Sequence, residues 1–277
     1  MIDDAAPPGR LDLGRQGFGA MRLRDGAAED PVRVVHAALD AGVVMIDTAD
    51  AYRNEELVGR AVAGRRDEVV LASKFGLVRH AGPGGGFDVR ADPRYVREAC
   101  EASLRRLGVD RIDLYHLHHR SDTVPVEDTV GAMADLVARG AIGAIGLSNV
   151  TADDLRRAHA VHPVTALQEQ WSLTSRSVEA ELVPVAAELG VTLVAHSPTG
   201  HGALHRGGVA AALDDIARAH GATPGQIALA WVHHRGRAHG LPVVPLPGTT
   251  RAAHVRLNAE AADITLTDDE LQRLDAA

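Results

Sequence analysis

A regular alternation between short apolar runs and longer amphipathic segments is the feature that most constrains the fold of this sequence. Val43-Val44-Met45-Ile46 has the length and apolar character of a buried strand, and it follows a helical pattern from Pro31 to Ala41 that stops before Gly42. About eight such strands alternate with helices along the chain, which is the pattern of parallel βαβ units closed into a barrel. The other strands are predicted at Val69 to Ser73, Ile112 to His118, Ala141 to Leu147, Ala166 to Gln170, Val191 to Ala195 and Pro242 to Leu246, and the other helices at Glu55 to Ala63, Asp92 to Leu107, Val126 to Arg139, Thr151 onward, Val178 to Leu189, Pro224 to His234 and Thr267 to Leu274.

The predicted fold class is therefore α/β, a (β/α)8 TIM barrel made by a single domain over residues 1–277. Leu11 to Met21 has two short apolar pieces broken by glycines, which predicts a short N-terminal β-hairpin ahead of the barrel. A doubly wound dinucleotide-binding sheet would instead begin with a strand, Gly-x-Gly-x-x-Gly and a helix, and no early stretch has that order. Gly82-Pro83-Gly84-Gly85-Gly86 lacks this spacing and is interpreted as a loop over the carboxyl end of the third strand.

Composition and charge indicate which kinds of binding partner the protein has. The formal net charge of -8 argues against a nucleic-acid surface, and no apolar run approaches the ~20 residues that span a bilayer. Met1 to Arg10 carries acidic residues and prolines in place of a secretion signal, so we expect a cytoplasmic protein that acts on small molecules. Cys100 is the only cysteine and is expected to be a packing residue. Nothing in the sequence indicates the oligomeric state.

Polar residues stand at the ends of the predicted strands. In a barrel of this kind the active site lies at the carboxyl ends of the strands, so these residues are the candidates for chemistry. Taken singly, each has an ordinary explanation as a turn former or a hydrogen-bonded core residue. The candidates are Asp47 with Tyr52 after the second strand, Lys74 in the third, His118 in the fourth, Ser148 and Asn149 in the fifth, and Gln168 in the sixth.

Lys74 is the only lysine in a chain with 29 Lys+Arg residues. Lysine is a compact charge whose pKa responds to its surroundings and which shifts the pKa of its neighbours, whereas arginine stays protonated. An ammonium beside Tyr52 would lower the pKa of its hydroxyl from about 10. Asp47 would hold the lysine charged, and a neutral His118 would polarise a substrate carbonyl.

The ordered motifs of the chain resemble those of the aldo-keto reductase family over nearly its whole length. The resemblance implies a barrel that reduces aldehydes or ketones with hydride from NADPH. It also implies a catalytic tetrad of Asp47, Tyr52, Lys74 and His118, with Tyr52 as the proton donor to the developing alkoxide. The matching pieces are Ile46-Asp47-Thr48-Ala49 with Tyr52, Asn54 to Gly59, Ser73-Lys74-Phe75-Gly76, Ser103 to Gly108, Ile112-Asp113-Leu114-Tyr115 leading to His118, Ile145 to Asn149, Gln168, Ser197-Pro198-Thr199-Gly200 and Pro247-Gly248-Thr249.

The same resemblance implies where NADPH binds. Ser148, Asn149 and Gln168 match the positions that hold the nicotinamide carboxamide, and amide and hydroxyl groups suit that ligand. The loop from Ser197 to Gly202, which includes Thr199 and Gly200, matches the pyrophosphate clasp. The 2′-phosphate and adenine end is matched by Gly248, Thr249, Thr250 and Arg251 ahead of a helix that carries His254 and Asn258. A helix start with hydroxyls and a guanidinium favours NADPH over NADH, although Thr249 and Thr250 also suit ordinary helix capping.

Three residues depart from the family pattern. His196 stands where many relatives have a tyrosine stacked on the nicotinamide ring, and imidazole offers less stacking area. His254 takes a position often held by a phosphate-binding arginine, and Leu257 replaces the acid that often precedes Asn258.

Two other functions stay open at this level. His116 and His118 alternate on one strand and face the same way, so they are candidate ligands of a metal-dependent barrel hydrolase. A cofactor-binding regulatory or scaffold subunit with little turnover is the second alternative. The substrate is expected to be selected by the loops Arg79 to Ala91 and His201 to Gly208.

Overall fold

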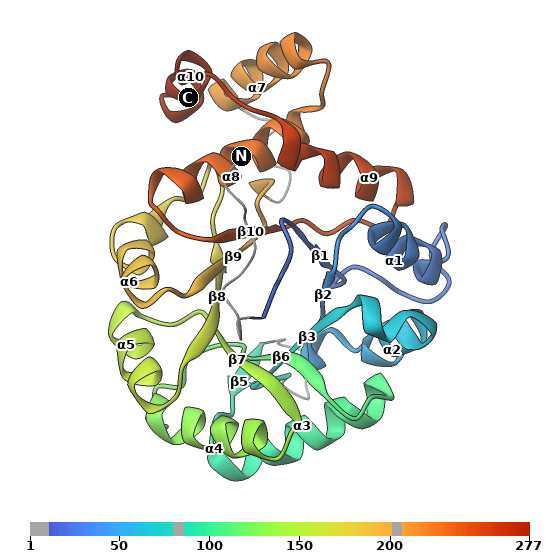
Figure 1. The fold of residues 1–277 in the computed structure, drawn as a ribbon, viewed down its shortest axis with the longest axis vertical. Coiled ribbons are helices and arrows are strands. Elements are labelled where there is room, and N and C mark those ends of the chain that lie inside the picture. Colours follow the sequence, from blue (N-terminus) through green and yellow to red (C-terminus); the bar gives the residue numbers. More distant parts are fainter. Residues whose placement is uncertain (1–10, 80–85, 201–206) are drawn as a thin grey trace.

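Eight parallel strands form one sheet at the centre of the computed structural model, which describes residues 11–79, 86–200 and 207–277. Neighbouring strands in the sheet follow one another along the chain (Figure 1). The strands are, in sheet order, β1 (Gly17–Gly19), β2 (Met45–Asp47), β3 (Val70–Phe75), β6 (Ile112–Leu117), β7 (Ile142–Ser148), β8 (Val164–Gln170), β9 (Thr192–His196) and β10 (Val243–Leu246).

The sheet curls until its first and last strands meet. The backbone N–H of Gly19 donates to the carbonyl oxygen of Pro247 over 3.0 Å, which brings β1 beside β10. A Cβ on Gly17 would lie 2.7 Å from Leu246 Cδ1, so a larger residue there would displace the Leu246 side chain. The predicted (β/α)8 barrel is confirmed.

Helices form a ring around the barrel in Figure 1. Eight of them follow barrel strands, and two more, α7 and α10, pack together outside the ring. No helix in the described ranges is long and apolar enough to cross a membrane. The ring comprises α1 (Pro31–Asp40), α2 (Glu55–Val62), α3 (Pro93–Leu107), α4 (Val126–Ala138), α5 (Ala152–Val161), α6 (Leu182–Leu189), α8 (Pro224–Ala238) and α9 (Ala252–Glu260), and the added pair is α7 (Gly207–His220) and α10 (Asp268–Asp275).

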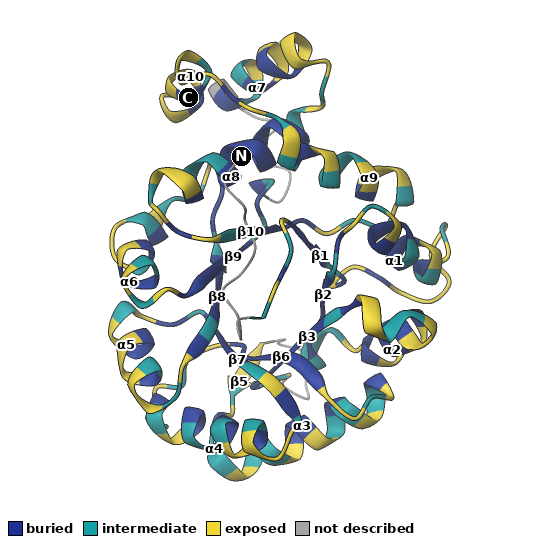
Figure 2. Cartoon of the chain, viewed as in Figure 1, coloured by how far each residue is buried: buried dark blue, intermediate teal, exposed yellow. Residues whose placement is uncertain are grey.

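Two apolar layers hold the barrel together, one on each face of the sheet. The larger layer fills the space between strands and helices, where Figure 2 shows the buried faces of the helices turned toward the sheet. The smaller layer lies inside the barrel, and both faces of a parallel sheet are expected to be buried in this way. Its buried members are Leu13, Met45, Ala72, Leu114, Ala166, Val194, Val244 and Leu246.

Local start and stop signals in the sequence are realised in the structure. Asp92 Oδ1 accepts a hydrogen bond from the Tyr95 backbone N–H at the start of α3, and Gly108 ends that helix with a φ of 67°. Thr151 and Thr267 each close a capping box at the start of their helices. Cys100 is fully buried in the larger layer, where burial raises the pKa of its thiol to about 12, so it serves packing as predicted.

Three features differ from the sequence prediction. The hairpin expected over Leu11 to Met21 is wrong, because the only strand in this stretch, β1, is parallel to β2, and its glycines Gly17 and Gly19 lie against Leu246 of β10. Residues 80–85, with most of the glycine-rich loop, lie outside the described residues, but their flanks β4 (Leu77–Arg79) and β5 (Phe87–Val89) form an antiparallel pair. The helix α7 was not predicted from the sequence.

Gly59 provides a test of the ring packing. A Cβ at this position of α2 would lie 2.1 Å from the carbonyl oxygen of Leu107 at the end of α3, so the two helices would have to separate. We expect Gly59→Ala to lower the free energy of unfolding by about 3 kcal/mol in urea titrations.

Gly131→Ala is the matched control, because Gly131 is also inside a helix but a Cβ there meets nothing within 4 Å. That change should raise the free energy of unfolding by roughly 0.5–1 kcal/mol. Equal stabilities of Gly59→Ala and the wild type would contradict the close packing of α2 on α3.

Candidate active site

The alternation of side chains along each strand places the candidate residues at one end of the barrel interior. Residues two positions apart on a strand face the same way, so counting on by two from an interior residue leads to the carboxyl end of that strand. Asp47 follows the interior residue Met45 by two positions, and Gln168 follows Ala166 in the same way. The same spacing takes Ala72 to Lys74, Leu114 to His118 through His116, Val194 to His196, and Leu246 to Gly248.

A buried ion pair lies at the centre of this end. The Nζ atom of Lys74 donates to Asp47 Oδ1 at 2.5 Å and to the carbonyl oxygen of Thr48 at 2.9 Å. Lys74 has no solvent exposure and Asp47 almost none. Burial by itself would lower the pKa of the Lys74 ammonium, but the charge of Asp47 and the hydrogen bond to it raise that pKa above its ordinary value. The lysine is therefore held as a cation.

Tyr52 lies over this cation. It ends the short helix Asp50–Tyr52 after β2, and its ring centroid is 5.1 Å from Lys74 Nζ. Burial raises the pKa of the Tyr52 hydroxyl above its ordinary value, and the charge of Lys74 opposes this rise. The expected net lowering of this pKa is therefore wrong, because Lys74 only limits a rise that burial imposes. The hydroxyl carries its proton at neutral pH.

His118 faces Tyr52 edge-on, with 5.6 Å between the ring centroids and an angle of 84° between the planes. Burial, together with the positive charge of Lys74, lowers the pKa of His118 to about 2. Its Nδ1 atom is buried and has no hydrogen-bond partner among the described residues. His118 is therefore a neutral imidazole with hydrogen-bonding capacity that the surrounding protein does not use.

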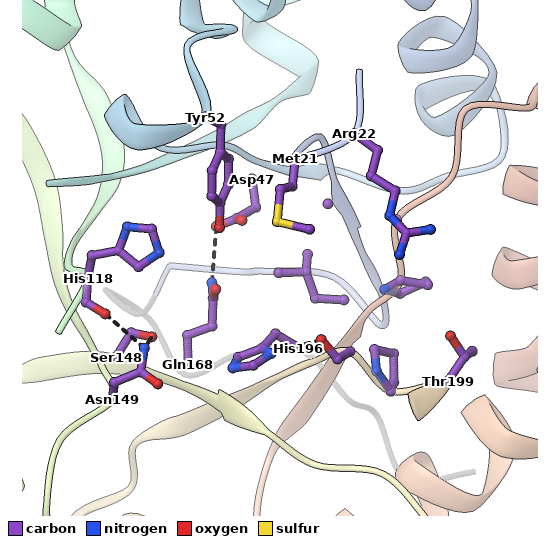
Figure 3. Close-up of a pocket in the computed structure, with 16 residues that line it drawn as sticks. Met21, Arg22, Asp47, Tyr52, His118, Ser148, Asn149, Gln168, His196 and Thr199 are labelled. Carbon is purple, nitrogen blue, oxygen red and sulfur yellow. Dashed lines mark hydrogen bonds between the residues drawn. The ribbon is translucent and has the colours of Figure 1, made fainter. Parts of the chain in front are cut away.

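Gln168 is linked to the ion pair through its amide. Its Nε2 atom donates to the second oxygen of Asp47 over 3.0 Å, which leaves the amide oxygen of Gln168 for a ligand (Figure 3). Asn149 follows β7 in the left-handed region with a φ of 52°, and its Nδ2 atom donates to the His118 carbonyl oxygen and to Ser148 Oγ. Asn149 thus joins the carboxyl ends of β6 and β7.

Glu169 supports this turn from behind. Its Oε1 atom accepts a hydrogen bond from the backbone N–H of Val150 at 3.1 Å, and the backbone of Asn149 also donates to the carboxylate. Glu169 is buried, and burial raises the pKa of its carboxyl group to about 7. Sequence reasoning missed Glu169, although an acid within a strand and next to a candidate ligand residue is a usable signal.

A cavity of about 390 Å³ connects these residues. In Figure 3, Tyr52, Asp47 and His118 approach it from one side and His196 and Thr199 from the other. Met21 and Arg22 also line it, and neither was singled out from the sequence. The predicted site residues on its walls are Asp47, Tyr52, His118, Ser148, Asn149, Gln168, His196, Ser197, Thr199 and Gly248, with Lys74 behind Asp47.

The loop after β9 contributes a tight turn to the cavity. Ser197 has a φ of 51°, and its carbonyl oxygen accepts from the backbone N–H of Gly200 at 2.9 Å. The Nδ1 atom of His196 lies 3.1 Å from Ser197 Oγ. Residues 201 and 202 of the predicted clasp lie outside the described residues.

The start of α9 is occupied differently from the prediction. The backbone N–H of Ala252 donates to a carboxylate oxygen of Glu29 over 2.9 Å, so an acid from the loop after β1 stands where a phosphate was expected. The Thr249 hydroxyl accepts from the backbone N–H of Arg251 at 3.2 Å, in the turn ahead of the helix, and the N-cap residue Arg251 makes no side-chain capping bond to α9. The remaining predicted residues at this end, which do not line the cavity, are Gly200, Thr249, Thr250, Arg251, His254 and Asn258.

His116 does not contribute to a metal site. Its ring packs against Gly146, where an added Cβ would lie 2.2 Å from the imidazole, and burial lowers the pKa of His116 to about 3. Within residues 11–79, 86–200 and 207–277, no group of three His, Cys, Asp or Glu side chains is arranged to hold a metal ion. The metal-dependent hydrolase is not favoured.

Comparisons with known proteins agree with this geometry. The protein-family model "Aldo/keto reductase family" matches residues 15–277. A crystal structure of an aldo/keto reductase from Klebsiella pneumoniae in complex with NADP and acetate is similar over 95% of this chain and 91% of that chain, with 34% identity and a TM-score of 0.81. An aldo-keto reductase from the same organism in complex with NADPH has 33% identity and a TM-score of 0.83 over 95% of this chain and 90% of that one. The glycerol dehydrogenase from Gluconobacter oxydans has 26% identity and a TM-score of 0.86 over 97% and 93% of the two chains.

The raised pKa of Glu169 predicts that the stability of the protein depends on pH. Its pKa is about 7 in the folded protein against 4.5 ordinarily, so between these values the unfolded carboxyl loses its proton before the folded one does. The free energy of unfolding should fall as pH rises through this window. Glu169→Gln keeps an acceptor for Val150 but does not titrate, so its stability relative to the wild type should grow by up to roughly 3 kcal/mol from pH 4.5 to above pH 7.

Urea titrations of both proteins across this range measure the difference. Asp50, whose pKa burial also raises to about 7, is present in both proteins, so its contribution cancels. Parallel stability curves for the two proteins would contradict a protonated buried Glu169.

Proposed function

Because the chain belongs to the aldo/keto reductase family, we propose that it reduces an aldehyde or ketone to an alcohol by hydride transfer from NADPH, with Tyr52 as the proton donor. The observation that carries this proposal is the arrangement of Tyr52 over the Lys74–Asp47 ion pair, beside a neutral His118, on the wall of a cavity. A small-molecule carbonyl compound is the partner that such a cavity accepts. Cys100 is a single, buried thiol, so the chain has no intrachain disulfide that would require an oxidising compartment. This is consistent with a cytoplasmic location.

The cavity suits the nicotinamide end of a dinucleotide cofactor. The amide oxygen of Gln168, the Asn149 turn and the His196 ring meet where a carboxamide-bearing ring needs hydrogen bonds and a flat surface. Further along, a Cβ at Gly248 would lie 2.8 Å from the Gly19 carbonyl oxygen, so the backbone is tightly packed at the edge of the site. Arg22 lies on the cavity opposite Thr199 and supplies a positive charge for phosphate (Figure 3). Bound NADPH supplies the hydride.

Tyr52 supplies the proton. Its hydroxyl is neutral at pH 7, and its O–H bond breaks as a new O–H bond forms on the substrate oxygen, which is far more basic once hydride has reached the carbonyl carbon. The phenolate left behind is stabilised by the Lys74 cation. Asp47 keeps that cation in place, so the pair prepares the site for charge that develops during the reaction.

His118 orients and polarises the carbonyl. A neutral imidazole has one N–H donor, and a hydrogen bond from it to the carbonyl oxygen draws electron density away from the carbon that receives hydride. An imidazolium would compete with Tyr52 as the acid, and the low pKa of His118 prevents this at neutral pH. The regulatory or scaffold alternative receives no specific support, because every element of this chemistry is in place around the cavity.

Glu29 modifies the cofactor preference that we propose. Its carboxylate accepts from the first free N–H of α9, and a carboxylate there repels a 2′-phosphate bound at the same helix start. Glu29 is half-buried, and its carboxylate weakens NADPH binding through charge repulsion. The acid therefore reduces the discrimination between NADPH and NADH.

Tyr52→Phe tests the proton donor. Loss of the hydroxyl should lower kcat for aldehyde reduction by about 10²–10⁴-fold, while NADPH binding measured by fluorescence titration should be retained. Tyr95→Phe is the matched control, because Tyr95 lies on α3 against Arg90 and outside the cavity, and its kcat should be unchanged. Undiminished turnover by Tyr52→Phe, or no reduction of any aldehyde by the wild type, would refute the proposed role.

Glu29→Gln tests the cofactor preference. Removing the charge should strengthen NADPH binding relative to NADH binding by about fivefold at low ionic strength, and the gain should shrink as salt is added. Dissociation constants for both cofactors give the ratio. Glu260→Gln, at the opposite end of α9, removes the same charge as a control and should leave the ratio unchanged. An unchanged ratio in Glu29→Gln would show that the carboxylate does not affect the 2′-phosphate.

A further inference from the structure

A second cavity, of about 800 Å³, is also lined by Tyr52 and His118. Both cavities share these two residues with Met21 and Arg22. None of the residues expected to hold the nicotinamide or the phosphates, apart from Arg22, lines the second cavity. The second cavity therefore gives a carbonyl group access to Tyr52 and His118 along walls that hold none of the other expected cofactor residues.

Four arginines line this second cavity, Arg22, Arg24, Arg53 and Arg79, and none of its described lining residues is a carboxylate. The chain as a whole carries a formal net charge of -8, so a wall of guanidinium groups stands out from the rest of the molecule. We propose that the substrate carries an anionic group, a carboxylate or a phosphate, which Arg24, Arg53 and Arg79 bind while its carbonyl lies at Tyr52. This inference rests on the proposed reductase function. Arg22 lines both cavities and is assigned to the cofactor phosphate.

The guanidinium groups are available to a ligand. In the described ranges of the chain, none of the four forms an ion pair with a carboxylate, whereas surface arginines such as Arg156 and Arg157 pair with glutamates at 2.6 Å. Arg24 donates from Nη1 to two backbone carbonyl oxygens, at 2.8 and 2.6 Å, which orients it without neutralising it. In the described chain these arginines therefore have no carboxylate within ion-pairing distance, and a bound anion would supply such a partner.

Arg53 and Arg79 each have a distinct local conformation or contact. Arg53 directly follows Tyr52 and takes the left-handed conformation with a φ of 57°, which a non-glycine residue adopts at an energetic cost and which recurs at functional sites. Arg79 ends β4, and its guanidinium carbon lies 4.8 Å from the centroid of the Phe87 ring on the paired strand β5. Both residues line the second cavity.

Apolar side chains occupy the same cavity. Met21 and Phe87 line it and are two of the three large hydrophobic residues that are most exposed in the described chain, at 42% and 41%. The substrate that fits this wall has a carbonyl at one end, an apolar or aromatic middle and an anion at the other end. Of the two loops expected to select the substrate, Arg79 to Ala91 contributes Arg79 and Phe87, and residues 201–206 of the other lie outside the described residues.

Matched pairs of aldehydes test the inference with the intact enzyme and NADPH. The first pair is 4-formylbenzoate and its neutral methyl ester, and the second is glyceraldehyde 3-phosphate and glyceraldehyde. We expect kcat/KM to favour the anionic member of at least one pair by about tenfold at low ionic strength, with the preference falling as salt is added. The pair with the larger preference identifies the anion as carboxylate or phosphate.

Arginine variants test whether these side chains cause the preference for anionic aldehydes. The double change Arg53→Gln/Arg79→Gln should lower the anionic-to-neutral ratio of kcat/KM by about tenfold, and Arg79→Gln alone should lower it in part. Arg33→Gln/Arg105→Gln removes the same charge from exposed positions on α1 and α3 and should leave the ratio unchanged.

The outcomes separate the two proposals. Reduction of the neutral aldehydes without preference for the anionic ones would overturn this inference and leave the reductase function standing. A preference that persists in both arginine variants would overturn it as well. No reduction of any aldehyde would overturn the reductase function and, with it, the substrate class.

Discussion

The ion pair between Lys74 and Asp47 is the interaction on which the rest of the site depends. Both groups are buried inside the barrel, so each charge is stable only because the other is present, and removing one partner of such a pair typically costs about 3–5 kcal/mol. The pair is also connected outward. Asp47 receives the amide of Gln168, and Lys74 lies under Tyr52 and helps to keep His118 neutral. The ion pair therefore fixes the charge of Lys74, and that charge adds to the effect of burial on His118 while it opposes the effect of burial on Tyr52.

The barrel makes this arrangement possible by separating apolar and polar positions along each strand. Interior residues such as Met45, Ala72 and Ala166 pack against one another in the middle of the barrel. Two residues further on, the same strands carry Asp47, Lys74 and Gln168, which lie above that packed layer and below the cavity. The apolar layer excludes water from beneath the charges, and this low-dielectric environment strengthens their mutual interaction. The residues that stabilise the barrel interior and the residues proposed to carry the chemistry are thus adjacent along the same strands.

Electrostatics divides the surroundings of Tyr52 into two regions. On one side lie amides, hydroxyls and the His196 ring, which suit a ligand held mainly by hydrogen bonds and stacking. On the other lie arginines without carboxylate partners in the described chain, together with exposed apolar side chains. Glu29 at the start of α9 adds a negative charge at the far end of the first region. The proposed functions of the two cavities follow from this contrast.

The sequence alone was sufficient for the barrel, for the helix caps such as Asp92 and Thr151, and for the residues at the strand ends, because hydrophobic period and capping chemistry are local properties of the chain. It could not reveal that the glycines of β1 serve contact with β10, that Glu29 reaches α9, or that Glu169 supports the Asn149 turn, since each contact joins segments that are distant in sequence. The direction of the Tyr52 pKa was also decided only by the tertiary structure. Lys74 was visible as the single lysine of the chain, but the burial that outweighs its charge at Tyr52 exists only once the barrel has closed around both residues.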